Sequence, residues 1–231
     1  MRILALETSA KACSAAVTED GRLIASAFQC TGLTHSRTLM PMIADMLKNA
    51  ELTLAGCDAV AVANGPGSFT GIRIGVSAAK GLAFGAEKPV IGVSTLEAMA
   101  RCVAGMDGII VCAMDARRGQ LYNAVFEAEG GTLSRLAPDR AVGLEELRKE
   151  LKNREKRKII VGDGALLCYN NFLENHIPCV LAPSHLLHQS AVGVAFVAED
   201  QARAGQLLSA QDLLPVYLRP SQAERLRKHT T

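Results

Sequence analysis

Short apolar runs separated by turn-forming residues recur along the first half of the chain, and each run has the length of a strand or of a helix face. Strands are predicted at 3–6, 13–17, 23–28, 59–63 and 89–93. Helices are predicted at 34–50, from a turn near 68–70 through 84, and from Ser94 to about Ala104. The first three strands follow one another through short turns, which predicts a meander, and the later strands alternate with helices, which predicts parallel pairing. The pattern therefore predicts an α/β fold with a largely buried sheet.

The second half of the chain begins with the same order of features as the first. Strands are predicted at 109–115, 120–127, 159–161 and 177–181, and helices at 144–158, 165–175 and 190–204. A shift of 108 positions pairs Ala5 with Ala113, Glu7 with Asp115, Ala16 with Ala124 and Val17 with Val125. Because the acids and the hairpins register together, we interpret the chain as a duplication. The first subdomain is expected at 1–106 and the second at 107–231.

A glycine-rich stretch at 64–75 connects a predicted strand to a predicted helix. Its glycines and Pro66 allow a sharp turn, and Ser68 or Thr70 can cap the helix that follows. Inside that helix the small residues Gly71, Gly75, Ala79 and Ala83 recur every four positions, which places them along one side. Each interior glycine costs about 1 kcal/mol relative to alanine, so we expect another backbone to lie close to this side.

Two functions are compatible with this stretch. A glycine turn at a helix start can bind a phosphate through free N–H groups, but the stretch lacks the Gly-Lys-Ser/Thr ending of a Walker P-loop. The small-residue side can instead be a packing surface, either within the domain or against a partner helix. The residues alone leave both possibilities open.

Composition narrows the class of protein. The 231 residues are 49% hydrophobic, enough for a substantial core, and the formal net charge is only +2, so the overall charge does not indicate strong nucleic-acid binding. Seven scattered cysteines without a Cys-x-x-Cys motif are typical of buried reduced thiols in a cytosolic protein. The N-terminus lacks a signal-peptide pattern, and no apolar run is long enough to span a membrane. We therefore expect a cytoplasmic protein with no membrane contact, and we interpret the basic end at Arg225, Arg227, Lys228 and His229 as a terminus rather than a recognition element.

The candidate chemistry centres on acids at strand ends. Glu7 and Asp115 occupy corresponding places, so a cleft between subdomains could bring both acids to one ligand, as in nucleotide-binding actin-like folds. Asp115 is as compatible with accepting turn N–H groups, and that role is favoured. The nucleotide candidates are Glu7, Thr8, Ser9, Gly65, Gly67 and Ser68. His185 and His188 are spaced like zinc ligands but lack a third ligand, and no nucleophile triad is evident, so neither a metal site nor catalytic residues are predicted.

Several motifs together resemble the TsaB family, also called YeaZ. They are Glu7-Thr8-Ser9, His35-Ser36, the Pro41 helix, the stretch Gly65 to Gly75, Ile91 to Leu96, Asp115-Ala116-Arg117, and Pro215-x-Tyr217-Leu218-Arg219. The resemblance covers nearly the whole chain. It implies two actin-like, ribonuclease-H-like subdomains with the second shortened, and a bacterial protein needed to place threonylcarbamoyl on the tRNA adenosine next to the anticodon (t6A formation).

The resemblance also implies partners. A family member is expected to be a noncatalytic scaffold that binds the catalytic subunit TsaD, with TsaE joining as ATPase, and to form a homodimer when alone. It is expected to need no cofactor itself, since ATP and metal belong to the partner subunits, and to reach tRNA through the complex. TsaD carries a His-x-x-x-His metal pair where this chain has Thr95 and Met99, so the metal site and the older glycoprotease label are not transferred.

The partner interface implied by the resemblance lies on the first two long helices. The expected interface residues are His35, Leu39, Met42, Met46, Gly71, Arg73, Gly75 and Ala79. In this hypothesis the small-residue side permits close approach of a partner helix, and the methionines at 40, 42 and 46 provide an adaptable surface. The alternative function is an actin-like ATPase or kinase that uses Glu7 and the glycine turn.

Overall fold

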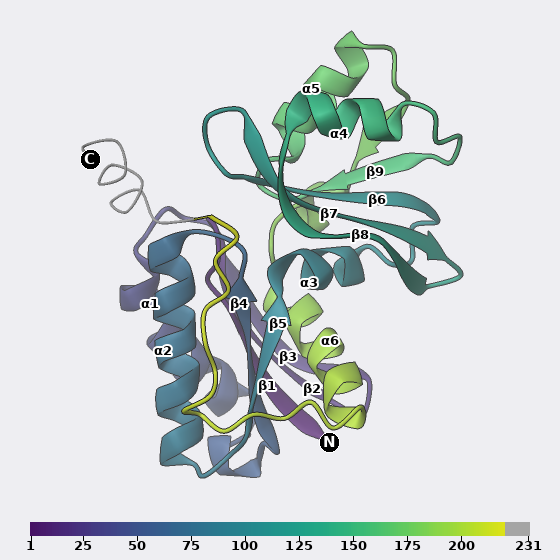
Figure 1. The fold of residues 1–231 in the computed structure, drawn as a ribbon. Helices are drawn as coiled ribbons and strands as arrows, with labels where there is room; N and C mark the ends of the chain where they lie inside the picture. The colour runs from purple at the N-terminus through teal and green to yellow at the C-terminus, as the bar shows by residue number, and fades with distance from the viewer. Residues whose placement is uncertain (220–231) are drawn as a thin grey trace, which may run out of the picture.

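The computed structural model describes residues 1–219, which form two lobes that each contain one five-stranded mixed sheet (Figure 1). The first lobe contains β1 (Arg2–Glu7), β2 (Cys13–Glu19), β3 (Arg22–Gln29), α1 (His35–Asn49), β4 (Ala59–Gly65), α2 (Phe69–Gly85), β5 (Val90–Ser94) and α3 (Thr95–Cys102). The second contains β6 (Gly108–Asp115), β7 (Gln120–Glu129), β8 (Thr132–Gly143), α4 (Leu144–Leu151), β9 (Lys158–Val161), α5 (Ala165–Glu174), β10 (Cys179–Leu181) and α6 (Ala191–Arg203). The basic end at Arg225, Arg227, Lys228 and His229 lies outside the described residues.

Strand order confirms that the two lobes share one plan. The first sheet runs β3-β2-β1-β4-β5 and the second runs β8-β7-β6-β9-β10, with an antiparallel meander followed by parallel strands in both. The α/β class, the two mixed sheets and the predicted meander are therefore correct. The turn at 64–75 also forms as expected, because Ser68 caps α2 by accepting a hydrogen bond from the Gly71 N–H.

The predicted register of the duplication is wrong by one residue in the first strand. In β1, Leu4 and Leu6 face α1 and α2, whereas in β6 the residues that face α4 and α5 are Val111 and Ala113. Leu4 therefore corresponds to Val111, and Glu7 is one position out of step with Asp115. Because successive side chains of a strand point to opposite faces, the two acids leave their sheets on opposite faces.

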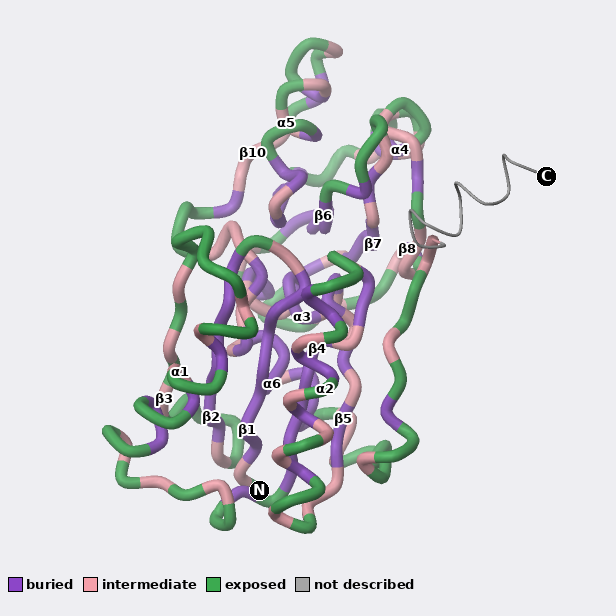
Figure 2. Tube along the Cα trace, turned by 90° about the vertical axis from the view of Figure 1, so that its left-hand side faces the viewer, coloured by how far each residue is buried: buried purple, intermediate pink, exposed green. Residues whose placement is uncertain are grey.

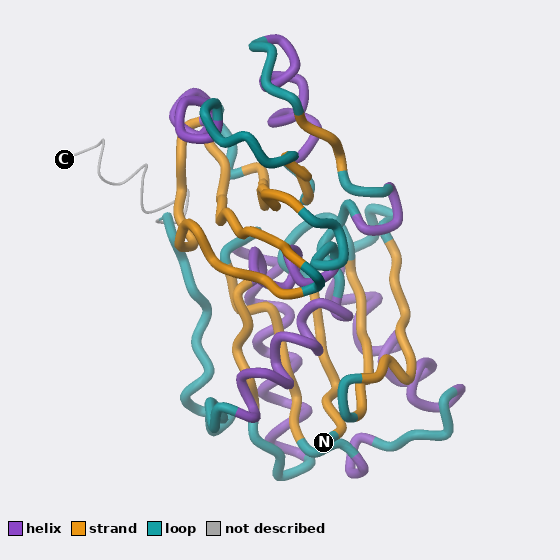
Figure 3. The backbone as a smooth tube through the Cα atoms, turned by 90° about the vertical axis from the view of Figure 1, so that its right-hand side faces the viewer, coloured by secondary structure: helices purple, strands orange, loops and turns teal. Residues whose placement is uncertain are grey.

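Each lobe contributes one helix that packs on the sheet of the other lobe. The third helix of the first lobe, α3, packs with Leu96 and Met99 against the inner face of the second sheet, whereas α6 covers the inner face of the first sheet with β1, β4 and β5. Figure 3 shows the strands and helices of the two lobes from the right-hand side of the view in Figure 1. The two helices cross closely, since a Cβ on Gly193 would lie 2.0 Å from the Ala98 carbonyl oxygen. The crossing joins the lobes.

The described residues after β10 do not stay with the second sheet, although the sequence analysis placed 107–231 in one subdomain. Residues after α6 return along the first lobe, pair with β5 at Leu208 and insert Leu213 into the core beneath α1 and α2. We call residues 204–219 the C-terminal strap. It is the yellow segment that climbs beside α2 toward the second lobe in Figure 1. Its apolar residues are scattered without helical or strand periodicity, so the hydrophobic pattern did not predict its course along the first lobe.

Three local predictions also need correction. The helix expected at 144–158 ends at Leu151, because no apolar residue follows until Ile159 to hold it against the core. Strand β8 was not predicted, since Pro138 and a mixed polar pattern are tolerated only at a sheet edge such as this one. Buried thiols are confirmed for four cysteines, but Cys30 is exposed.

Candidate functional site

A cleft of about 470 Å³ lies between the lobes and contains several of the candidate residues. Its lining comes from the β1–β2 turn, the glycine turn, the β6–β7 turn and the strap, and includes Ser9, Lys11, Gly67, Ser68, Asp115, Arg117, Asp163, Tyr217 and Arg219. Strand ends from both sheets meet here, because the two lobes face each other across the exchanged helices. Because open α/β sheets bind ligands outside the carboxyl ends of their strands, this cleft is the candidate ligand site.

Glu7 does not reach this cleft. Its side chain is fully buried at the end of β1, where Oε1 accepts a hydrogen bond from the Ser9 N–H and Oε2 has no partner among the described residues. Burial raises the pKa of Glu7 to about 7, with a smaller contribution from the charge of Asp163, and the hydrogen bond from Ser9 opposes the rise. The buried carboxyl group therefore stabilises the β1–β2 turn by accepting the Ser9 N–H, and it does not face the cleft.

Asp115 occupies a different environment from Glu7. It is exposed at the end of β6 and accepts a hydrogen bond from the Arg117 N–H at 2.7 Å. This is the turn-accepting role favoured from the sequence. The hypothesis that both acids meet one ligand is wrong, because one acid lies behind its strand end and the other lies at the cleft surface.

The glycine turn does not fit a nucleotide phosphate. A Cβ on Gly65 would lie 2.2 Å from the Val216 carbonyl oxygen, and one on Gly67 would lie 2.4 Å from that of Ser9, so protein backbone fills the open side of both glycines. The Ser68 N–H donates to the Ser9 carbonyl at 2.7 Å, and the Gly71 N–H is capped by Ser68. Two donors that an anion would need are thus already engaged. These glycines permit close internal packing.

The small-residue side of α2 also faces inward, which contradicts its predicted exposure to a partner. Gly71, Gly75 and Ala79 are buried against the first sheet. A Cβ on Gly71 would lie 2.2 Å from the Thr8 carbonyl oxygen, and one on Gly75 would lie 2.4 Å from Thr8 Oγ1. The expected close approach of another backbone is correct, but that backbone is the chain's own β1–β2 turn.

Two more expected interface residues are core residues. Leu39 is 1% exposed and Met46 is 7% exposed, and both pack beneath α1 with the first sheet. His35 is half-buried at the start of α1, where its ring Nε2 lies 2.7 Å from the Ala10 carbonyl oxygen. Met42 is half-buried at the edge of α1. Of the predicted set, only Arg73 is exposed.

The outer face of α1 and α2 holds apolar residues that the sequence prediction missed. On α1 the exposed residues include Met40, Pro41 and Ala44, and on α2 Phe69 is 37% exposed. Figure 2 shows exposed stretches, in green, along both helices. Met40 belongs to the methionine group already recognised at 40, 42 and 46, so the signal was present. The sequence pattern alone did not show which of these methionines are exposed and which are buried.

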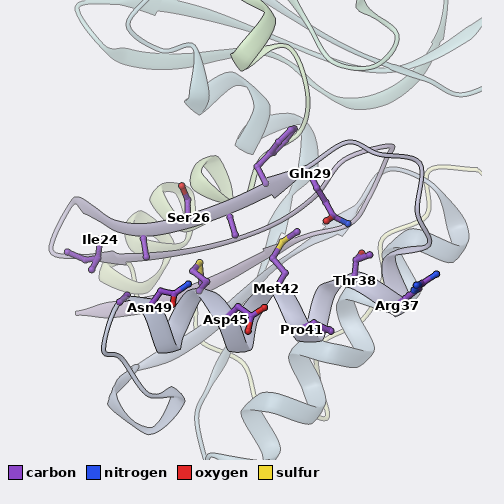
Figure 4. Close-up of a pocket in the computed structure, with 14 residues that line it drawn as sticks. Ile24, Ser26, Gln29, Arg37, Thr38, Pro41, Met42, Asp45 and Asn49 are labelled. Carbon is purple, nitrogen blue, oxygen red and sulfur yellow. The ribbon is translucent and has the colours of Figure 1, made fainter.

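An open groove of about 740 Å³ runs beside this face, between β3 and α1 (Figure 4). Small side chains at Ala25 and Ala27 form part of its lining on the strand, and Pro41, Met42 and Asp45 line it on the helix. The same strand, β3, lies at the edge of the first sheet and exposes Leu23 (45%), Ile24 (37%) and Phe28 (50%). We call α1, β3 and the groove between them the β3–α1 surface.

The two histidines at 185 and 188 and the positions of the TsaD metal pair do not form a metal site among the described residues. His185 lies in a short 3-10 turn at Ser184–Leu186 and His188 follows it, and residues 1–219 contain no group of three or more His, Cys, Asp or Glu residues that could hold a metal ion. Thr95 and Met99 are buried, and Met99 is a core residue of the second lobe. Among the described residues, no helix has the length and apolar character needed to cross a bilayer.

Comparisons with known proteins agree with this plan. A family model described as TsaD, tRNA N6-adenosine threonylcarbamoyltransferase, matches residues 29–167. The tRNA threonylcarbamoyladenosine biosynthesis protein TsaB of Escherichia coli K12 is 33% identical over 226 residues, which cover 96% of each chain. The structure of YeaZ from Pseudomonas aeruginosa superposes with a TM-score of 0.77 at 29% identity, covering 94% of this chain and 99% of that one.

A more distant structure supports the fold alone. Component A of the (R)-2-hydroxyglutaryl-CoA dehydratase of Acidaminococcus fermentans superposes with a TM-score of 0.51 at 12% identity, covering 88% of this chain and 99% of that one. The near full-length similarity to TsaB and the shared architecture with YeaZ lead to one assignment. The chain belongs to the TsaB (YeaZ) family of tRNA threonylcarbamoyladenosine biosynthesis proteins, with the two-lobed actin-like fold.

Proposed function

We propose that this chain is a noncatalytic assembly subunit that binds and supports a TsaD-type threonylcarbamoyltransferase, with TsaE as a third member. In this proposal the chain needs no cofactor of its own, ATP and metal act on the partner subunits, and tRNA is reached through the complex. The observation that carries the proposal is the exposed apolar face of α1 beside the open groove of the β3–α1 surface.

Burial of apolar surface is the main source of affinity that this face offers. Each square ångström of apolar area removed from water contributes roughly 25 cal/mol, and Met40, Pro41 and Ala44 present such area on consecutive turns of one helix. Methionine adapts its shape to a partner. The exposed Phe69 and Arg73 at the start of α2 extend the face with residue types that are enriched at protein interfaces.

The match to the TsaD model supports a related partner. A partner that shares the first-lobe plan would present an equivalent helix pair, so two such faces can pack about an approximate two-fold axis. We propose the same face for a homodimer of this chain when TsaD is absent. Formation of the homodimer and of the TsaD complex would then be mutually exclusive.

The interface proposal is tested by placing a charge on α1. We expect Met40→Glu combined with Ala44→Glu to weaken binding to a purified TsaD-type partner at least about tenfold, because both carboxylates would be desolvated at the interface. Lys149→Glu on the exposed side of α4 is the matched control and should bind as wild type. Titration calorimetry measures the affinity, and thermal unfolding verifies that the variants fold. Wild-type affinity in the double variant would exclude this face.

The alternative function, an actin-like ATPase or kinase, requires a different experiment. The filled glycine turn and the buried Glu7 count against it, so we expect the isolated protein to give no heat of binding with ATP and magnesium and no nucleotide turnover. Tight binding with turnover by the isolated protein would replace the scaffold proposal by the enzyme.

A further inference from the structure

The two halves of the C-terminal strap are held very differently. In the first half, Leu208 exchanges two backbone hydrogen bonds of 2.9 Å with Val90, and the Lys80 ammonium group donates to the carbonyls of Gln211 and Leu213. Leu213 is fully buried in the core of the first lobe. This half is therefore firmly anchored to the first lobe.

The second half, residues 214–219, lies on the surface and ends on the other lobe. Leu214 is 66% exposed, and both Val216 and Tyr217 are at least 40% exposed. The Val216 N–H donates to the Asn64 carbonyl at 2.7 Å, beside the glycine turn of the first lobe. The Arg219 guanidinium donates to the Ala116 carbonyl at 2.8 Å, in the β6–β7 turn of the second lobe.

An aromatic and cationic cluster fixes the middle of this half. The Tyr217 ring stacks on Phe69 with ring centroids 4.9 Å apart, and its hydroxyl accepts a hydrogen bond from Arg73 Nε at 3.0 Å. The Arg73 guanidinium also lies 3.9 Å from the Phe69 ring centroid. These contacts are exposed to solvent. Segments held by few buried apolar contacts and by exposed hydrogen bonds open at low free-energy cost.

Besides the packing of α3 on the second sheet and the contacts of Ser94 and Glu97 with β8, the lobes meet at two places of different character. At the back, α3 and α6 cross with the Gly193 backbone against Ala98, both buried and apolar. At the mouth of the cleft, the strap spans from the glycine turn to the β6–β7 turn through one backbone hydrogen bond from Val216 and one part-buried hydrogen bond from Arg219. The α3–α6 crossing is closely packed and could act as a hinge between the lobes, whereas the strap end is held by only a few hydrogen bonds and could detach.

We propose that residues 214–219 are a releasable clasp. Bound, as in this structure, the clasp holds the lobes at one angle and covers Gly65, while Tyr217 and Arg219 form part of the cleft wall. Released, it allows the lobes to rotate about the α3–α6 crossing and opens the cleft to solvent.

The proposal is tested by removing the side chains that hold the clasp in the full-length protein. Arg219→Ala combined with Tyr217→Ala should increase amide hydrogen exchange about tenfold both in the β6–β7 turn and at the α3–α6 crossing, which is the change expected for losing a hydrogen bond and an aromatic contact. Exchange at the crossing is the decisive readout, because Ala98 and Gly193 do not touch the clasp. Small-angle scattering of the same variant should show a larger radius of gyration.

Leu214→Ala is the matched control. It lies in the same segment, its side chain is mostly exposed, and its carbonyl can still accept from Asn64 Nδ2. We expect wild-type exchange and scattering from this control. If the double variant increases hydrogen exchange only in residues 214–219 and leaves exchange at the crossing and the scattering unchanged, the strap end does not control the lobe arrangement and the clasp is refuted.

Discussion

The two lobes repeat one strand order, yet their equivalent edge strands differ in chemistry. In the first lobe, β3 exposes Leu23, Ile24 and Phe28, and an open groove separates it from α1. In the second lobe, the equivalent strand β8 contributes no large exposed hydrophobic side chain among the described residues.

The gap between β8 and α4 in the second lobe is bridged by charge. Arg140 on β8 pairs with Glu150 on α4 at 2.6 Å, whereas the groove between β3 and α1 has no such bridge among the described residues. An edge strand is an open pairing site that most proteins protect with charge or a cover. The second lobe is protected by its own side chains, and the first retains the apolar surface that a partner would cover. One duplicated plan has therefore produced a lobe whose edge is bridged by charge, which we call the closed lobe, and a lobe whose edge is apolar and unbridged among the described residues, which we call the open lobe.

The largest effect should come from the inward side of α2 in the first lobe. We expect Gly75→Leu to lower the free energy of unfolding by more than about 3 kcal/mol, because even a Cβ at this position would lie 2.4 Å from Thr8 Oγ1. Chemical denaturation measures the loss, with Gly75→Ala as a milder variant if the leucine protein does not fold. Gly81→Ala is the control on the same helix, since nothing lies within 4 Å of its Cβ position.

Gly81→Ala is an informative control because it should raise the free energy of unfolding, whereas Gly75→Leu should lower it. An exposed helical glycine replaced by alanine gains about 0.5–1 kcal/mol from a lower entropy of the unfolded chain. Wild-type stability in Gly75→Leu would show that α2 can move away from the sheet. Its small residues would then be free to face a partner, as the sequence first suggested.

The second prediction concerns the strand-end acids. Because the pKa of Glu7 is raised to about 7 in the folded protein from a usual value of 4.5, the folded chain keeps a proton that the unfolded chain releases. The free energy of unfolding should therefore fall as pH rises from about 4.5 to 7, by about 3 kcal/mol in total. Below this window the penalty is absent, and above it the penalty is complete.

Glu7→Gln tests this assignment by removing the ionisable group at constant shape. The variant should lose the Glu7 contribution to the slope between pH 4.5 and 7 and should be more stable than wild type at pH 8, as measured by urea denaturation at each pH. Part of the slope should remain, because burial also raises the pKa of Asp163. Asp115→Asn, at the exposed strand end of the second lobe, should leave the Glu7 contribution to the slope in place. An unaltered slope in Glu7→Gln would place the titrating group elsewhere.

These two predictions show where sequence reasoning succeeded and where it stopped. The four-residue spacing of Gly71, Gly75 and Ala79 correctly required a backbone nearby, but periodicity fixes which side of a helix is small and says nothing of what lies against it. The alternating strand pattern located both acids, but a one-residue offset in β1 decided which one is buried.

Other features lacked a local signal altogether. The edge strand β8 has a mixed pattern because polar partners cover it, so it does not resemble a strand that packs on a core. Residues 204–219 are ordered by contacts with α2 and β5, which are distant in sequence. The exposed apolar residues of α1 could be recognised as methionine-rich but not as exposed, because exposure depends on where the helix lies.

The third prediction tests the closed lobe. Arg135 on β8 contacts Glu97 at 2.5 Å and Asp139 at 2.6 Å, and its guanidinium lies 4.6 Å from the Phe126 ring centroid. We expect Arg135→Ala to cost about 1–2 kcal/mol of unfolding free energy, and less at high salt because the ion pairs are partly screened. Arg22→Ala, on the exposed start of β3, should change stability by less than about 0.5 kcal/mol. Equal losses in both variants would remove the distinction between the two edges.

The smallest effect on folding should come from the open lobe. Phe28 on β3 is 50% exposed, so Phe28→Ser should change the free energy of unfolding by less than about 1 kcal/mol. If the β3–α1 surface associates, the same variant should reduce self-association and binding to the TsaD-type partner, because an apolar contact is replaced by a hydroxyl that would be desolvated. Sedimentation velocity over a range of concentrations measures the first effect and calorimetry the second. Ser134→Ala on β8 is the matched edge-strand control and should alter neither. A Phe28→Ser protein that folds and associates as wild type would mean that binding is confined to the helices and that the exposed edge of β3 is not part of the interface.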